Sequence, residues 1–285
     1  MVYWISLTPF CLLYVRSDCY AFLLYHVFRY RRKVVRDNLV KSFPEKTSDE
    51  IKKIEKHFYR NFCDVFVEFC KTFTAKREQI KERFTVTNPE VMRELYRKNK
   101  SVFLAMHHSS NWEWLWHVMD EVSAHEPCAI YKKFSNHYFD ELLKKGRVRY
   151  ADLGGNLIED RETLRALKSR QGRIDACFIL ADQSPQGGKS DYWTEFLHRD
   201  TCWFTGLERI ARLLDLAVVY VDMKRTSRGH YTVTFETICE SPRTVENGFI
   251  MEQYVRHIER FLTEQPDNWL WSHRRWKHSR QTVAS

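Results

Sequence analysis

The sequence predicts an α/β domain with a central, mostly parallel sheet flanked by helices, preceded by an apolar helical segment at the N-terminus. Short apolar runs alternate along the chain with stretches in which apolar residues recur every three or four positions. The apolar runs lack polar alternation, as is typical of strands buried on both faces of a parallel sheet. The chain of 285 residues can form one large domain. We therefore predict an N-terminal segment over residues 1–28 and a single domain over residues 29–285.

The N-terminal segment consists of two apolar stretches, VYWISLTPFCLLYV and CYAFLLYHVF, separated by Arg16, Ser17 and Asp18. Neither stretch reaches the roughly 20 apolar residues that a membrane-spanning helix needs. A basic cluster over residues 29–33 follows at once, as is common at the cytoplasmic face of a bilayer. We expect residues 1–28 to form an interfacial helix or helical hairpin that docks on a membrane. The alternative is an N-terminal helix buried in the core.

The elements of the domain follow from capping signals and hydrophobic periodicity. Thr47 and Glu50 form a capping box, and apolar residues at steps of three and four then predict a long helix to about residue 69. A short helix should begin at Asn88-Pro89-Glu90 and end near Tyr96. Further helical patterns cover residues 111–122, 136–146, 159–170, 205–214 and 244–264. Buried strands are predicted at residues 102–106, 129–131, 176–180 and 218–221, and a half-exposed edge strand at residues 230–235, where polar and apolar residues alternate.

Composition, charge and the motifs present limit the classes of function that the chain can have. The net charge of +9 favours an anionic partner, which can be nucleic acid, a membrane surface or an acidic protein. The basic residues form no stripe and no nucleic-acid motif is present, so we expect no nucleic-acid binding. The eight cysteines include no Cys-x-x-Cys pair, which argues against a zinc site and a dense disulfide framework. No Gly-x-Ser-x-Gly turn of a serine hydrolase follows a strand. We expect no metal and no cofactor.

The stretch His107-His108-Ser109-Ser110-Asn111-Trp112-Glu113 follows the predicted strand at residues 102–106. In parallel sheets, ligands bind beyond the carboxyl ends of the strands. A turn between strand and helix can bring His108 over Glu113, so that one ring nitrogen bonds the carboxylate while the other faces a pocket. The first backbone N–H groups of the helix can then hold developing negative charge. The alternative is structural: Ser110 and Glu113 form a capping box at the helix start.

The block from His108 to Glu113 resembles the motif of the bacterial lipid A late acyltransferases, a branch of the lysophospholipid acyltransferases, which typically reads His-aromatic-Gly-Asn-Trp-Glu. The register of Asn111-Trp112-Glu113 selects His108 over His107 as the catalytic histidine. Blocks at residues 30–35, 38–45, 181–185, 205–208 and 271–277 resemble further family segments in the same order. The chain departs from the pattern in three places: Ser109-Ser110 replaces the aromatic-glycine step, Arg147-Val148-Arg149-Tyr150 runs into Ala151 instead of glycine, and Phe196-Leu197-His198 replaces a phenylalanine-glycine step.

The resemblance implies a glycerolipid-acyltransferase-like fold at the cytoplasmic face of the bacterial inner membrane. It implies transfer of a fatty acyl chain from an acyl carrier protein thioester to a hydroxyl of a lipid A precursor. His108 would remove the hydroxyl proton and Glu113 would orient the imidazole. The candidate substrate-binding residues are Asn111, Arg147, Arg149, Asp182 and Gln183, with the arginines suited to phosphates. From the residues alone, the arginines can equally be a solvated helix end, and Asp182-Gln183 a turn after the strand at residues 176–181.

Two rival functions remain open. The same histidine and glutamate can serve a lysophospholipid or aminolipid acceptor, although the usual glycerophospholipid motif ends in aspartate and Asn111-Trp112-Glu113 favours the lipid A branch. A non-catalytic, membrane-docked lipid-binding protein is the other alternative. The two serines at positions 109 and 110 fit such a protein, whereas an intact His108 and Glu113 argue against it.

Overall fold

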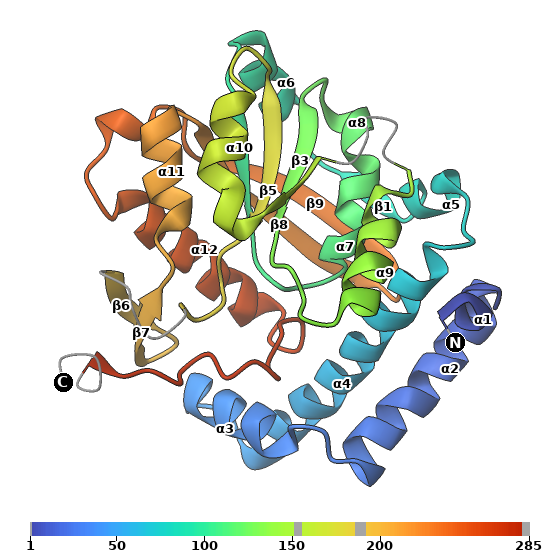
Figure 1. Ribbon diagram of the computed structural model, residues 1–285. Helices are drawn as coiled ribbons and strands as arrows, with labels where there is room; N and C mark the ends of the chain where they lie inside the picture. The colour runs from blue at the N-terminus through green and yellow to red at the C-terminus, as the bar shows by residue number, and fades with distance from the viewer. Residues whose placement is uncertain (1, 151–155, 186–191, 281–285) are drawn as a thin grey trace.

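The computed structural model describes residues 2–150, 156–185 and 192–280, so Met1 and Ala151 lie outside it. Its centre is a seven-stranded sheet with the order β1-β9-β8-β2-β5-β3-β4 (Figure 1). Neighbouring strands run parallel except for β8 and β9, which pair antiparallel. The predicted α/β architecture with a mostly parallel sheet is thus confirmed.

All five predicted strands are present. The sheet consists of β1 (Phe84–Val86), β2 (Val102–Met106), β3 (Glu126–Tyr131), β4 (Asn156–Glu159), β5 (Asp175–Leu180), β8 (Ala217–Ser227) and β9 (His230–Cys239). The prediction that residues 230–235 form an edge strand was wrong, because β1 pairs with the outer side of β9. A separate antiparallel hairpin, β6 (Tyr192–Phe196) and β7 (Arg199–Trp203), was not predicted.

Both faces of the sheet are buried. Successive side chains of a strand point to opposite sides, so each central strand contributes to two hydrophobic clusters. In β2, Phe103 and Ala105 join one hydrophobic cluster, whereas Val102, Leu104 and Met106 join the other. The first cluster includes side chains of α10 (Thr163–Ser169), α11 (Gly206–Leu214) and α12 (Phe249–Glu264). The second includes side chains of α5 (Arg77–Lys81), α6 (Glu90–Arg97), α7 (Trp112–Leu115) and α8 (Met119–Val122). All five residues of β2 are buried, as its unbroken apolar run predicted.

Further helices of the domain are α3 (Arg32–Ser42), α4 (Ser48–Lys71) and α9 (His137–Val148). The capping box that starts α4 is confirmed, since the Thr47 hydroxyl accepts from the Glu50 amide and the Glu50 carboxylate accepts from the Thr47 amide at 2.8 Å. The helix predicted over residues 111–122 is interrupted by a 3₁₀ turn at Trp116–Val118, which separates α7 from α8.

The N-terminal segment forms α1 (Val2–Ser6) and α2 (Phe10–Phe22), followed by a π-helical turn at Leu23–Val27. Ile5 and Leu13 pack with Val67 and Cys70 of α4, so one side of the segment is buried. In Figure 1, α2 runs alongside α4 at the edge of the molecule. Among the described residues, no helix combines the length and apolar character needed to span a bilayer. The segment is therefore partly buried, and it leaves the apolar side chains of its outer face exposed.

Candidate active site

The site lies where the two central parallel strands end. Met106 of β2 pairs in register with Leu180 of β5, so the residues that follow each strand emerge side by side at the carboxyl edge. His108 comes two residues after Met106, and Asp182 comes two residues after Leu180. The sheet register therefore brings together two side chains that are 74 residues apart in the sequence.

Asp182 holds His108 through two bonds. The Nδ1 atom of His108 lies 2.5 Å from Oδ1 of Asp182, and the backbone N–H of His108 donates to Oδ2 at 3.0 Å. The indole N–H of Trp269 donates to the same Oδ2 at 2.7 Å. Burial acts to raise the pKa of Asp182, but the charge and hydrogen bonds of His108 outweigh it and hold that pKa well below its ordinary value. Asp182 is therefore a buried, ionised carboxylate that fixes the imidazole.

The second ring nitrogen of His108 faces Gln183, whose side-chain nitrogen lies 3.2 Å away. If that amide donates, Nε2 accepts and the ring proton sits on Nδ1, facing Asp182; this tautomer is assigned from the network of partners. Nε2 is then the basic atom. The side chain of His108 is 17% exposed, whereas that of Asp182 is 2% exposed. The ring is thus anchored at Nδ1 by a buried carboxylate, while Nε2 faces Gln183 and the side chain keeps some exposure to solvent.

The sequence predicted that Glu113 would bond the His108 ring, but the structure pairs Glu113 with Arg147. Both of its oxygens accept from the guanidinium of Arg147 on α9, from Nε at 2.8 Å and from Nη2 at 2.5 Å. Burial acts to raise the pKa of Glu113, but Arg147 outweighs it and lowers that pKa; His108 contributes a smaller lowering by charge. The carboxylate that bonds Nδ1 of His108 is Asp182, because the strand register delivers it there and α9 delivers an arginine to Glu113.

The turn between β2 and α7 is fixed by two polar side chains. Ser110 is not the N-cap that was predicted: it has a left-handed backbone (φ 51°), and its hydroxyl donates to the Met223 carbonyl at 2.7 Å. Asn111 is the N-cap, and its side-chain oxygen accepts from the Trp114 amide at 3.1 Å. The Asn111 amide group donates to Glu68 at 2.6 Å. Asn111, predicted to bind substrate, is fully buried and holds the loop instead.

His107 lies on the other side of the backbone, inside the core. Its ring stacks on Tyr220 and meets Phe261 edge-on. Burial lowers the pKa of His107 to about 4, so it is neutral near pH 7. The adjacent histidines therefore differ in environment, and only His108 borders the groove described below.

The other predicted residues take distinct places. Gln183 lies at Nε2 of His108, and Arg147 is bonded to Glu113. Arg149 is exposed at the end of α9, and its guanidinium lies over the ring of Tyr150, 5.4 Å from the ring centroid. The alternative of a solvated helix end thus describes Arg149 but not Arg147, whose side chain is 20% exposed and pairs with Glu113.

His108 lines a small groove. Its lining includes the apolar side chains of Phe58, Phe62, Val65, Trp112 and Trp269, together with polar residues such as Asn61 and Asp267. Within the described ranges, no three histidine, cysteine, aspartate or glutamate side chains come together as metal ligands. The groove thus places several apolar side chains next to His108, a combination that suits a lipid chain attached to a reacting polar group.

The segment at residues 267–270 is a part of the site that sequence reasoning missed. Trp269 bonds Asp182, the Leu270 amide donates to the His108 carbonyl at 3.0 Å, and Asn268 bonds Ser110. The only signal in the sequence was the tryptophan-rich run around residues 269–271, which is also compatible with a simple core segment.

Comparison with known proteins gives a consistent result. The model of a family described as bacterial lipid A biosynthesis acyltransferase matches residues 1–278. The chain is 22% identical over 249 residues to the lipid A biosynthesis palmitoleoyltransferase of Escherichia coli (strain K12), which covers 87% of this chain and 79% of that protein. The lipid A biosynthesis acyltransferase of Shigella flexneri matches with the same identity and coverage.

Proposed function

Because the chain belongs to the family of bacterial lipid A biosynthesis acyltransferases and is therefore an acyltransferase, we propose that it acylates a hydroxyl of a lipid A precursor, using an acyl carrier protein thioester as donor. The observation that carries this proposal is the His108 imidazole, anchored to Asp182 at Nδ1, with Gln183 at Nε2, on the border of a groove lined in part by apolar side chains. Acyl carrier proteins are acidic, so the net charge of +9 suits the docking of such a donor.

The proposed reaction is a direct transfer. Nε2 of His108 takes the proton of the acceptor hydroxyl while its oxygen attacks the thioester carbonyl. The carbon–sulfur bond then breaks, and the leaving thiolate takes the proton back from the imidazolium. Asp182 keeps the proton on Nδ1 and stabilises the imidazolium while it exists. No covalent acyl-enzyme is needed, and no cofactor takes part.

Glu113 and Arg147 act as a pair in this proposal. Glu113 is close enough to His108 for the charge of the histidine to contribute to the lowering of the Glu113 pKa. It also holds the Arg147 guanidinium by two parallel bonds, a geometry that fixes a planar cation. Arg147 so fixed places positive charge beside the reacting groups, where a phosphate of the acceptor can bind.

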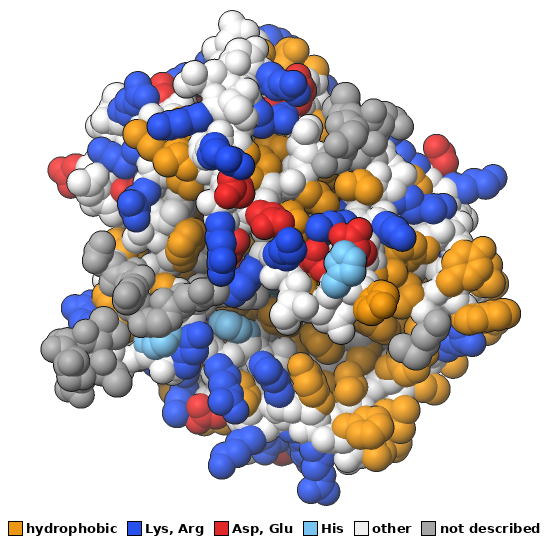
Figure 2. All heavy atoms as spheres, in the orientation of Figure 1, with side chains coloured by type: hydrophobic (Ala, Val, Ile, Leu, Met, Phe, Trp, Pro, Cys, Tyr) orange, Lys and Arg blue, Asp and Glu red, His pale blue; other side chains and the backbone are white. Residues whose placement is uncertain are grey.

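We further propose that residues 2–28 dock the enzyme on a membrane surface. Side chains on the outer face of this segment include Trp4 (74% exposed), Leu12, Val15, Phe22 and Phe28 (69% exposed). Figure 2 shows apolar side chains gathered on the side of the molecule where α1 and α2 lie. Exposed apolar patches of this kind mark interaction sites, and aromatic residues favour the membrane interface.

The membrane proposal predicts that the double variant Trp4→Asp/Phe22→Asp loses cosedimentation with anionic phospholipid vesicles, because charged residues cannot enter the acyl layer. The matched control is Leu213→Asp, which changes a leucine that is 51% exposed on α11. That control should sediment with the vesicles as the unchanged protein does. Equal sedimentation of the double variant would contradict the docking role.

The experiment that tests the proposed function offers the detergent-solubilised enzyme three acceptors: a lipid A precursor with a vacant hydroxyl, a lysophospholipid and an aminolipid. Each is paired with acyl carrier protein and coenzyme A thioesters. We expect acylation of the lipid A precursor, with the acyl carrier protein thioester as the better donor. Turnover of the lysophospholipid or aminolipid alone would overturn the acceptor, and folded protein that turns over none of them would favour the lipid-binding alternative.

A further inference from the structure

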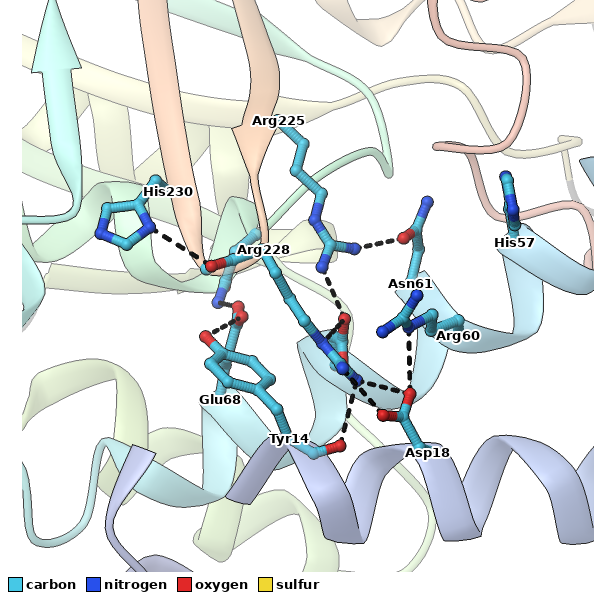
Figure 3. Close-up of polar contacts among 12 residues, drawn as sticks. Tyr14, Asp18, His57, Arg60, Asn61, Glu68, Arg225, Arg228 and His230 are labelled. Atoms are coloured by element: carbon cyan, nitrogen blue, oxygen red, sulfur yellow. Dashed lines mark hydrogen bonds and ion pairs between the residues drawn. The ribbon is translucent and has the colours of Figure 1, made fainter. Parts of the chain in front are cut away.

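The inner face of α2 carries polar side chains next to the buried Leu13, in contrast to the exposed apolar side chains of its outer face. Figure 3 shows Tyr14 and Asp18 pointing from α2 toward Glu68 and Arg228. The Tyr14 hydroxyl donates to Oε1 of Glu68 at 2.8 Å. Gly229 permits this approach, since a Cβ atom there would lie 1.9 Å from the Tyr14 hydroxyl. The helix is thus bound to the domain by specific polar contacts as well as by packing.

Glu68 is shared between α2 and the loop that carries His108. While Oε1 accepts from Tyr14, Oε2 accepts from the Asn111 amide at 2.6 Å and from the Tyr231 hydroxyl at 2.6 Å. The backbone carbonyl of Glu68 also accepts from the Trp114 indole at 3.1 Å. Glu68 is fully buried, so its position is set by these donors and not by water. One carboxylate therefore connects the N-terminal helix to the N-cap of α7.

A second set of contacts runs from α2 to the same loop. Arg228 bonds both Asp18 of α2 and Asp64 of α4, and Asp64 also bonds Arg225 (Figure 3). The backbone of Arg225 exchanges two hydrogen bonds with the side chain of Gln265. Gln265 accepts from Asn268, which in turn bonds both the amide and the hydroxyl of Ser110. Ser110 and Asn111, the two residues that shape the turn, are thus both connected to α2.

From these contacts we infer that Glu68 is a positioning residue of the acyltransferase site, through which Tyr14 of α2 helps to set the geometry of the His108 loop. The inference rests on the proposed role of His108 as the base. Asn111 is three residues from His108, and its side chain is the only cap of α7 that the described contacts provide. Small displacements of a base from its substrate cost large factors in rate, about 10²-fold for 1 Å. The N-terminal helix is therefore part of the active-site assembly in addition to any membrane role.

The test measures kcat and KM of Tyr14→Phe and Glu68→Gln in detergent micelles, where vesicle docking no longer matters. Tyr14→Phe removes only the hydroxyl that bonds Glu68. Glu68→Gln removes the charge and replaces one acceptor oxygen by an NH₂ donor, so a tyrosine hydroxyl that now donates must turn round to accept. We expect kcat to fall about tenfold for Tyr14→Phe and further for Glu68→Gln, with KM nearly unchanged, because the base and not the groove is displaced.

The matched control is Tyr138→Phe, which removes the hydroxyl of a tyrosine that is 87% exposed on α9. It should leave kcat and KM unchanged. Asn111→Ser keeps a capping oxygen but removes the donor to Glu68. Because Tyr14 and Asn111 meet at one carboxylate, the double variant should lose less than the product of the two single losses. Hydrogen exchange at the Trp114 amide, which Asn111 caps, should quicken in Tyr14→Phe.

The outcomes separate the two proposals. If transfer depends on His108 but kcat of Tyr14→Phe and Glu68→Gln equals that of the unchanged enzyme, the positioning role is overturned and the proposed function stands. A change in KM alone, or independent losses in the Tyr14 and Asn111 variants, also overturns it. If transfer does not depend on His108, the proposed function fails and this inference fails with it.

Discussion

Replacing Asp182 by asparagine is expected to lower kcat for acyl transfer by about 10²–10⁴-fold while leaving the fold intact. The reason lies in the donors around the carboxylate. Oδ2 of Asp182 accepts from both the Trp269 indole and the His108 backbone amide, so an asparagine would place its oxygen there. Its NH₂ group would then face Nδ1 of His108. That nitrogen would have to accept, the ring proton would move to Nε2, and His108 could no longer take a proton there.

Steady-state kinetics of Asp182→Asn at saturating donor checks this prediction, with circular dichroism to show that the variant is folded. The matched control is Asp37→Asn, which removes the charge of an aspartate whose side chain is 54% exposed and pairs only with Lys41 at i+4 among the described contacts. Such a pair contributes little to stability, so the control should keep full activity. Undiminished transfer by Asp182→Asn would show that another group orients the base.

Replacing His108 by alanine is expected to lower kcat by about 10²–10⁴-fold or more, since it removes the general base. The imidazole is also the partner of the buried Asp182 carboxylate, so its removal should lower stability as well, and circular dichroism must show that the variant is folded. His137→Ala, at an exposed histidine at the start of α9, is the control and should match the unchanged enzyme. A His108→Ala variant that keeps transfer within tenfold of the unchanged enzyme would rule out the base assigned here.

The sequence predicted the sheet well because its central strands are buried on both faces. An unbroken apolar run such as Val102–Met106 has few alternatives in a chain of this composition, and the parallel order follows from the helices between the strands. The edge position of residues 230–235 was wrong because alternation shows only that a strand has unlike faces. It does not show whether a short strand such as β1 pairs beyond it.

The hairpin of β6 and β7 was not predictable from its turn. Leu197 and His198 both have positive φ, which two-residue hairpins require but which glycine or asparagine normally supplies. A tertiary contact supports the turn instead: the Leu197 amide donates to Glu259 of α12 at 2.8 Å. Local preference alone could not show this, because the stabilising partner is 62 residues away in the sequence.

The site was predicted only in part, again because contacts between segments that are distant in the sequence decide its geometry. The position of His108 at a strand end followed from the sequence, and so did the start of a helix just after it. The partner of Nδ1 did not, because it depends on the register between β2 and β5, which brings Asp182 to the same edge. The pairing of Glu113 with Arg147 likewise depends on how α9 packs, and spacing within one motif carries no information about either contact.

The most direct test of the central claim, that the His108 imidazole takes the proton of the acceptor hydroxyl, is chemical rescue of His108→Gly. Single-turnover transfer from an acyl carrier protein thioester to a lipid A precursor would be measured with and without added imidazole. The account predicts a rate that rises with imidazole concentration and saturates, with no such rise for Asp182→Asn, in which the native ring still fills the site. A His108→Gly variant that transfers at the rate of the unchanged enzyme without imidazole would contradict the claim.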